Sequence, residues 1–157
     1  MLVGQFNLLV LRYGWFWQLF TSIFVHANLL HLALNMFFLL AIGRRMETMV
    51  GGRFMLVTFF VSGLTGNLFS LLSGPMVVSV GASGGVLGLY AAAIVMNKTV
   101  SRASGSALSS LLILFLFNSI FPGADILAHL GGILAGALIG FILGLRIKRR
   151  YDAVSYT

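Results

Sequence analysis

The sequence predicts an all-α membrane protein, a polytopic helical bundle of about five transmembrane helices. Only 8% of its 157 residues are charged, whereas 59% are hydrophobic and the mean hydropathy is +1.04. A soluble domain carries about a quarter charged residues, because its core needs a polar cover. The net charge of +7 would suit a protein that binds nucleic acid. Long apolar stretches separate the basic residues, however, so we expect a lipid bilayer as partner and no nucleic acid.

Stretches without charged residues define the spans, since a helix needs about 20 apolar residues to cross a bilayer. Residues 54–97 carry no charge and suffice for two crossings, with a break at Ser73-Gly74-Pro75. Phe121-Pro122-Gly123 breaks the later region in the same way. The predicted spans are 28–47, 54–72, 82–97, 106–121 and 125–145.

The basic residues predict the orientation of these spans. With five alternating crossings, all ten basic residues except Arg12 fall on one face. Cytoplasmic loops are enriched in Lys and Arg, so we expect a multi-pass protein of the cell membrane with a cytoplasmic basic tail at 146–157. Residues 1–27 would form an external interfacial loop, because 1–11 is too short to cross and aromatic residues cluster at 13–17. The whole chain, 1–157, would be a single membrane domain.

The composition excludes several kinds of site. The chain has no cysteine, and its only acids are Glu47, Asp125 and Asp152. Thiol nucleophiles, Cys-based zinc sites and paired-carboxylate mechanisms are therefore excluded. His26 and His31 are five residues apart, an awkward spacing for two metal ligands on one helix, and no carboxylate accompanies them. We expect no metal and no cofactor.

Four polar residues stand out within the spans. His31 and Asn35 are spaced i, i+4 on one face of the first span, Ser83 opens the third span, and His129 lies one turn into the last. A single serine or histidine in a membrane helix is often a packing residue or a proton relay. Together, at one depth near the outer face, these four suggest a nucleophile, its base and an anion-stabilising pair.

Small residues predict how the serine and the histidine meet. Small-xxx-small faces let membrane helices approach closely, and packing two such faces would bring Ser83 and His129 together. The last span carries one stripe at spacing four, Gly132, Gly136, Gly140 and Gly144, and the third carries Gly84, Gly88 and Ala92.

The motifs that contain these residues resemble those of the rhomboid intramembrane serine proteases, over about residues 15–144. Residues 26–35, which include His26, His31 and Asn35, resemble the family's HxxxxHxxxN stretch. Gly81-Ala82-Ser83-Gly84 resembles its GxSG box, and residues 128–132, which end at Gly132, its AHxxG box. Residues 43–51, with Glu47 at the centre, resemble its GxxxExxxG turn.

The resemblance implies a rhomboid-like core and a serine endopeptidase that works without a carboxylate. Ser83 would be the nucleophile and His129 its general base, while His31, Asn35 and the backbone N–H of Ser83 would line the oxyanion hole. Glu47 would be structural, near Arg44 and Arg45. The substrates would be single-pass membrane proteins, cut in or near their transmembrane helix. Asp125 is expected to cap the last helix.

The chain departs from the family in three places. Members have a span before the external loop, whereas this chain is expected to begin inside that loop, either because the sequence is truncated or because this is a five-span version. Gln18 stands where many members carry Arg, so the loop is expected to be anchored differently. Leu87 stands where an aromatic residue often stacks on the catalytic histidine, so His129 is expected to be held less firmly.

Two other functions remain open. One is a catalytically inactive rhomboid-like protein that binds membrane clients, although the presence of both Ser83 and His129 argues against it. The other is a small transporter or channel with His31 and His129 on a proton path, which would need a more polar lining than this chain offers.

Overall fold

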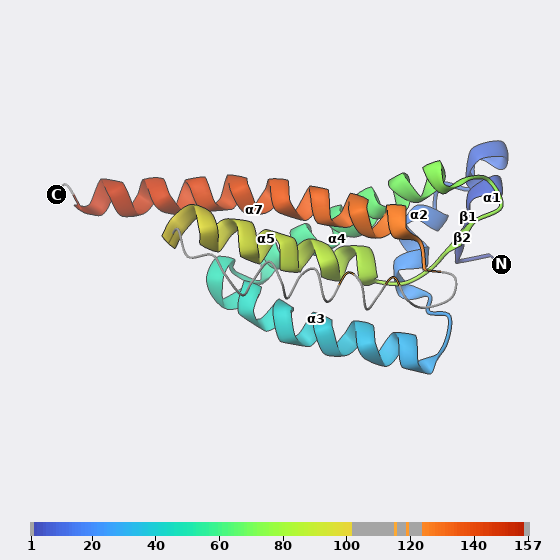
Figure 1. Ribbon diagram of the computed structural model, residues 1–157, viewed down its shortest axis with the longest axis horizontal. Coiled ribbons are helices and arrows are strands. Elements are labelled where there is room, and N and C mark those ends of the chain that lie inside the picture. The colour runs from blue at the N-terminus through green and yellow to red at the C-terminus, as the bar shows by residue number, and fades with distance from the viewer. Residues whose placement is uncertain (1, 102–114, 116–118, 120–123, 156–157) are drawn as a thin grey trace.

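The computed structural model describes residues 2–101, 115, 119 and 124–155. Within this part, long helices lie side by side, and a cap of short elements covers one end (Figure 1). The elements in chain order are β1 (Gln5–Phe6), α1 (Asn7–Tyr13), α2 (Gln18–Thr21), η1 (Ser22–Phe24), α3 (Leu29–Val50), α4 (Gly52–Ser70), η2 (Leu71–Ser73), β2 (Val78–Ser79), α5 (Ser83–Ser101) and α7 (Ile126–Ser155).

Among the described residues, three helical stretches are long and apolar enough to cross a membrane: Leu29–Val50, Gly52–Ser73 and Ile126–Ala153. The chain is therefore a multi-pass helical membrane protein, as the sequence predicts. Helix α5, the third predicted span, is not among the three; it carries Asn97 and Lys98 near its end. The predicted span 106–121 lies, apart from Phe115 and Ser119, outside the described residues.

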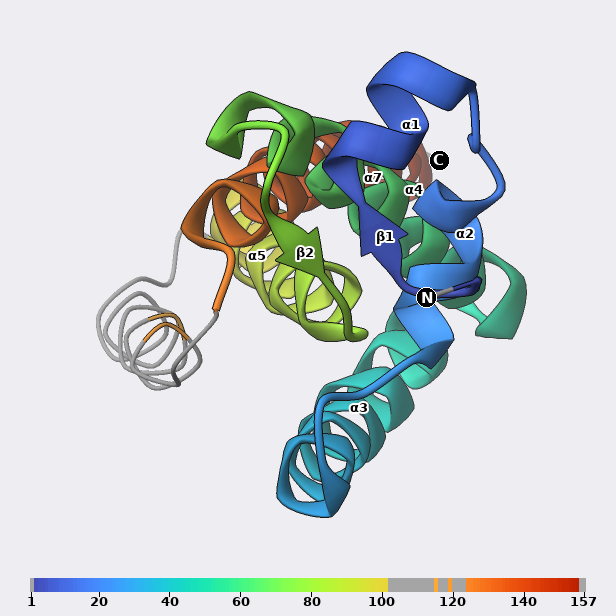
Figure 2. The same ribbon diagram turned by 90° about the vertical axis from the view of Figure 1, so that its right-hand side faces the viewer.

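Helix α5 occupies the centre of the bundle. It contacts α3, α4 and α7, and its side chains include some of the most deeply buried in the protein, such as Leu87, Leu89 and Met96. Helix α3 stands out to one side when the bundle is viewed from its end (Figure 2). Because it is central, α5 exposes less surface to lipid than a peripheral helix does.

The predicted glycine packing between α5 and α7 is confirmed. A methyl group on Gly132 would overlap the carbonyl oxygen of Gly84, and one on Gly136 would overlap that of Gly88. The same relation joins Gly140 to the carbonyl of Ala92. The two backbones touch along the stripe, as small residues permit in lipid.

Helix α4 carries a third stripe of small residues, which sequence analysis did not identify. Thr58, Ser62, Gly66 and Ser70 are spaced four apart, and all four are buried. A methyl group on Gly66 would lie 2.5 Å from the carbonyl oxygen of Ala128, at the start of α7. The stripe lets α4 pack closely against α5 and α7 and completes a core of three closely packed helices.

The segment 1–27, predicted to be an interfacial loop, contains four short elements and is docked on the bundle. Strand β1 pairs antiparallel with β2, and the side chain of Gln5 donates to the carbonyl of Asn67 at 2.9 Å. Asn7 donates to the carbonyl of Ser70 at 2.6 Å. Gln18 is fully buried, and its side-chain oxygen accepts from Phe6 N–H at 3.0 Å. Buried amides, whose partners are backbone groups distant in sequence, order this segment.

The basic residues gather at one end of the bundle. The end of the bundle that carries β1 and β2 is called here the site end, and the opposite end is called the basic end. Helices α3, α5 and α7 all begin at the site end and run to the basic end (Figure 1). Arg44, Arg45, Lys98 and Arg146 therefore lie toward the basic end, and Arg53 opens α4 there. Residues of the predicted tail continue α7 as far as Ser155. At 30 residues, α7 is about 45 Å long, more than the roughly 30 Å hydrocarbon core.

Candidate active site

The hydroxyl of Ser83 and the imidazole of His129 are in direct contact at the site end. Ser83 is the first residue of α5, and its Oγ lies 2.8 Å from His129 Nε2. His129 lies in the first turn of α7, where its N–H donates to the carbonyl of Asp125 at 3.1 Å. The two side chains are 7% and 4% exposed. Because Gly84 and Gly132 touch just beside them, the small-residue packing sets the distance between the two reacting groups.

The turn before Ser83 needs glycine at position 81. Gly81 has φ +121, a conformation that L residues rarely adopt. A Cβ there would lie 2.8 Å from Cε1 and 2.9 Å from Nε2 of His31. The Gly81 N–H donates to the carbonyl of Ser22 at 3.0 Å. Glycine at this position therefore lets the docked N-terminal segment hold the turn and lets the His31 ring lie against it.

His31 and Asn35 present donors toward the same turn. The N–H of Ala27 donates to His31 Nδ1 at 3.4 Å, which leaves the proton of a neutral ring on Nε2, beside Gly81. Asn35 is 2% exposed, and its Nδ2 donates to the carbonyl of His31 at 2.9 Å. That Nδ2 also lies 3.9 Å from the place a Gly81 Cβ would take. Both predicted oxyanion residues thus flank the turn that leads into Ser83.

The start of α5 adds backbone donors. The first bond of the helix runs from Val86 N–H to the carbonyl of Ala82 at 3.0 Å. The N–H groups of Ser83, Gly84 and Gly85 come before it, where a helix supplies them with no acceptor of its own. The positive end of the helix dipole favours negative charge at that point. An oxyanion beside Ser83 would meet backbone and side-chain donors together.

His26 supports His31 from outside the spans. The two rings meet edge to face with centroids 5.2 Å apart. His26 Nε2 is buried without a hydrogen-bond partner among the described residues. Burial lowers the pKa of His26 below its ordinary value, and a hydrogen bond with the backbone of Phe24 opposes this shift in part. His26 is therefore a neutral packing partner of His31 at neutral pH.

No described carboxylate is hydrogen-bonded to His129. Asp125 Oδ1 accepts from Ala128 N–H at 3.2 Å and from the Ser73 hydroxyl at 2.9 Å, so the predicted helix cap is confirmed. Glu47 and Asp152 lie at the basic end. The described residues also hold no group of three or more His, Cys, Asp or Glu side chains able to bind a metal ion.

Sequence analysis missed two contacts of His129. Ser119 Oγ lies 3.3 Å from His129 Nδ1, and the Phe115 ring meets the imidazole edge to face with centroids 6.3 Å apart. Leu87, in the place of the family's stacking aromatic, is fully buried and belongs to the same apolar cluster as Phe115. Phe115 is thus the aromatic residue that contacts the His129 ring, and the less firm hold on His129 stays a prediction.

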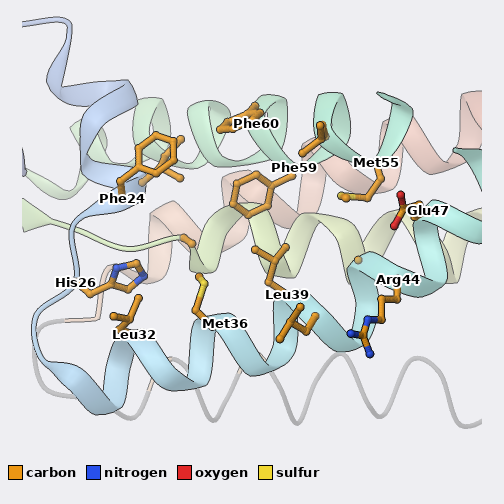
Figure 3. Close-up of a pocket in the computed structure, with 15 residues that line it drawn as sticks. Phe24, His26, Leu32, Met36, Leu39, Arg44, Glu47, Met55, Phe59 and Phe60 are labelled. Atoms are coloured by element: carbon orange, nitrogen blue, oxygen red, sulfur yellow. The ribbon is translucent and has the colours of Figure 1, made fainter. Parts of the chain in front are cut away.

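A groove of about 590 Å³ between α3 and α4 lies beside the site. Figure 3 shows His26 at one end of the groove and Arg44 and Glu47 at the other, with apolar side chains between them. The Arg44 guanidinium points away from the Glu47 carboxylate. Glu47 Oε1 instead lies 3.2 Å from the place a Gly52 Cβ would take, at the start of α4, where the helix dipole favours a negative charge. Glu47 therefore supports the turn between α3 and α4, away from the candidate site.

The fold and the site together define a polytopic membrane protein with a buried serine–histidine pair, in which no carboxylate among the described residues is hydrogen-bonded to the histidine. Residues 13–146 match the rhomboid domain. RHOMBOID-like protein 6, mitochondrial, of Arabidopsis thaliana is 36% identical over 133 residues, which cover 81% of this chain and 43% of that protein. Rhomboid-like protease 3 of Toxoplasma gondii is 37% identical over 131 residues, covering 78% and 50% respectively.

The similarity to a bacterial relative extends over a larger share of both chains. YdcA of Bacillus subtilis (strain 168) is 30% identical over 155 residues, which cover 95% of this chain and 77% of that protein. The chain spans half or less of the length of the Arabidopsis and Toxoplasma relatives just named. The extent of the domain match and the YdcA similarity establish that the chain belongs to the rhomboid family.

Proposed function

We propose that this protein is an intramembrane serine endopeptidase that hydrolyses peptide bonds with a Ser83–His129 dyad. The observation that carries the proposal is the 2.8 Å contact between Ser83 Oγ and His129 Nε2, both buried at the site end. A serine hydroxyl is a weak nucleophile until an adjacent base takes its proton. Membership of the rhomboid family supports the same reading.

The reaction follows from the positions of the groups. His129 Nε2 takes the Ser83 proton as Oγ attacks the peptide carbonyl, and the resulting oxyanion accepts hydrogen bonds from the Ser83 N–H, His31 and Asn35. The imidazolium then gives its proton to the departing amine. Water, activated by the same imidazole, releases the acyl group from Ser83. The Asn35 amide nitrogen, now bonded to the carbonyl of His31, would turn to reach the oxyanion.

The proposed substrates are single-pass membrane proteins, cut in or near their transmembrane helix. A peptide bond inside a helix is sterically closed to attack, so small, helix-destabilising residues around the cut would favour hydrolysis. We place the protein in the cell membrane, with the site end outside and the C-terminus in the cytoplasm, because the basic residues gather at the other end of the bundle.

The test is cleavage of a single-span substrate with a helix-destabilised segment, in detergent and in liposomes. The parent chain is expected to cut it, and Ser83→Ala and His129→Ala are each expected to abolish cutting. Thr48→Ala is the matched control, because it removes an exposed hydroxyl at the basic end that donates to the carbonyl of Arg45. Binding of the substrate by the parent without cleavage would favour the client-binding function. Cleavage by either dyad variant at the parental rate would overturn the assignment.

A further inference from the structure

The side of His129 that faces away from Ser83 contacts two residues that the proposed reaction does not use. Ser119 Oγ lies 3.3 Å from Nδ1, a long hydrogen bond, and the Phe115 ring stands at 77° to the imidazole with centroids 6.3 Å apart. Both residues are helical and stand four positions apart in the sequence. Both imidazole nitrogens of His129 therefore have a hydroxyl within reach.

With a hydroxyl at each nitrogen, the tautomer of His129 determines whether the ring can take the Ser83 proton. In one arrangement the Ser83 hydroxyl donates to Nε2 and Nδ1–H donates to Ser119, which leaves His129 ready to act as a base. In the other arrangement Ser119 donates to Nδ1 and Nε2–H donates to Ser83, which blocks the transfer. Only a group that accepts from Nδ1 supports the first arrangement in a buried site, because an unpaired buried N–H is costly.

No described carboxylate is hydrogen-bonded to Nδ1. Asp125 lies one turn before His129, where its Oδ1 accepts from Ala128 N–H and the Ser73 hydroxyl, and its Oδ2 is buried without a hydrogen-bond partner among the described residues. The Ser119 hydroxyl is the group that lies within hydrogen-bonding reach of Nδ1. When His129 takes the Ser83 proton, the Nδ1–H···Oγ bond becomes charge-assisted and strengthens. Ser119 therefore stabilises the imidazolium that forms during the reaction more than it stabilises the neutral ring.

Packing fixes the ring plane that this bond requires. Phe115 meets the imidazole edge to face, a favoured arrangement for ring pairs. Phe115 packs in turn against the cluster of fully buried Leu87 and Ala91. Contact with Phe115 therefore gives the imidazole an aromatic neighbour that is itself held by buried side chains.

We propose that Ser119 and Phe115 are positioning residues that hold His129 with its proton on Nδ1 and its Nε2 lone pair toward Ser83. The proposal rests on the proposed peptidase function for its kinetic consequences. Its structural content, the tautomer of one ring, is measurable without any catalysis. Neither residue touches the substrate in this scheme, and both act through His129.

The test reads the tautomer directly by ¹⁵N NMR of histidine-labelled protein. The chain has 3 histidines, and His129→Ala identifies the signal of His129. In the parent chain and in Ser83→Ala we expect the proton on Nδ1. In Ser119→Ala we expect the population to move toward the Nε2–H form, and Ser119→Thr should restore the parental state because it returns a hydroxyl. An unchanged tautomer in Ser119→Ala, or a proton already on Nε2 in Ser83→Ala, would overturn the proposal.

Cleavage kinetics provide the second readout. Ser119→Ala should lower kcat about tenfold with little change in KM, and Phe115→Leu should lower kcat roughly two- to tenfold. Ser119→Thr should recover the rate, and Thr48→Ala should leave it unchanged. A rise in KM at constant kcat would contradict a positioning role. If Ser83→Ala still cuts while the tautomer follows Ser119, the peptidase proposal fails and the positioning of the ring stands.

Discussion

Substitution of Gly136 by alanine tests the packing that joins the two halves of the site. Gly136 lies in the middle of the α7 stripe, and a Cβ there would lie 2.5 Å from both Cα and the carbonyl carbon of Gly88. Non-bonded carbons prefer about 3.5–4.0 Å, so α5 and α7 must separate by about 1 Å. Ser83 and His129 are carried by these two helices, and their 2.8 Å contact would lengthen toward about 3.8 Å, beyond hydrogen-bonding distance.

Two free-energy terms of opposite sign determine the stability of Gly136→Ala, and the destabilising term is the larger. Alanine in a helix interior gains up to about 1 kcal/mol over glycine. Overpacking against a backbone that has no flexible atom to move costs about 1–3 kcal/mol or more. We therefore expect Gly136→Ala to lower the midpoint of thermal unfolding by about 2–8 °C. Because a displacement of about 1 Å at reacting groups costs on the order of 10²-fold in rate, cleavage should suffer more than stability.

The matched control is Gly43→Ala, in α3. The nearest atom to a Cβ at Gly43 is Leu39 Cδ1 at 3.9 Å, an ordinary contact, so this substitution keeps the helix-propensity gain without the clash. Unfolding in detergent, followed by circular dichroism, and cleavage of the single-span substrate are measured for both variants. Equal unfolding midpoints and equal rates for Gly136→Ala and the parent would refute the argument that this stripe sets the Ser83–His129 distance.

Three further predictions concern single residues. Asn35→Ala should slow cleavage by about 10²–10³-fold if Asn35 donates to the oxyanion, and an unchanged rate would remove it from the site. Asp125→Ala should lower stability by about 1 kcal/mol through loss of the α7 cap, while Asp125→Ser, which keeps a capping oxygen, should retain most of it; equal unfolding midpoints for the two would contradict the cap. Burial lowers the pKa of His26, so the unfolded chain binds more protons than the folded one below about pH 6.5. Stability should therefore fall as the pH drops below that value, and His26→Gln should flatten this dependence in unfolding curves recorded between about pH 7 and 5; an unchanged slope would refute the assignment.

Residue patterns within single helices predicted much of the architecture. Gaps between charged residues located α3, α4, α5 and α7 to within a few residues, except that α7 runs on to Ser155. The glycine spacing predicted which faces of α5 and α7 touch, because small residues are the means by which membrane helices approach. The proximity of Ser83 to His129 followed from that packing.

Other features depend on partners that the pattern does not reveal. The stripe from Thr58 to Ser70 has the same spacing as the glycine stripes, but it mixes three residue types and its partner is the backbone of two other helices. The order of the N-terminal segment depends on amides such as Gln18, whose partner is a backbone N–H. Ser119 is one of several serines between residues 100 and 120. Only its position beside His129 Nδ1 separates it from the others.

The measurement that tests the central claim most directly is labelling of Ser83 by a fluorophosphonate probe in the intact chain, located by peptide mass spectrometry. A buried serine reacts with such a probe only when a neighbouring base activates it. We expect labelling at Ser83 in the parent, and loss of labelling in both Ser83→Ala and His129→Ala. Labelling of Ser83 that persists at the parental rate in a folded His129→Ala variant would contradict the dyad.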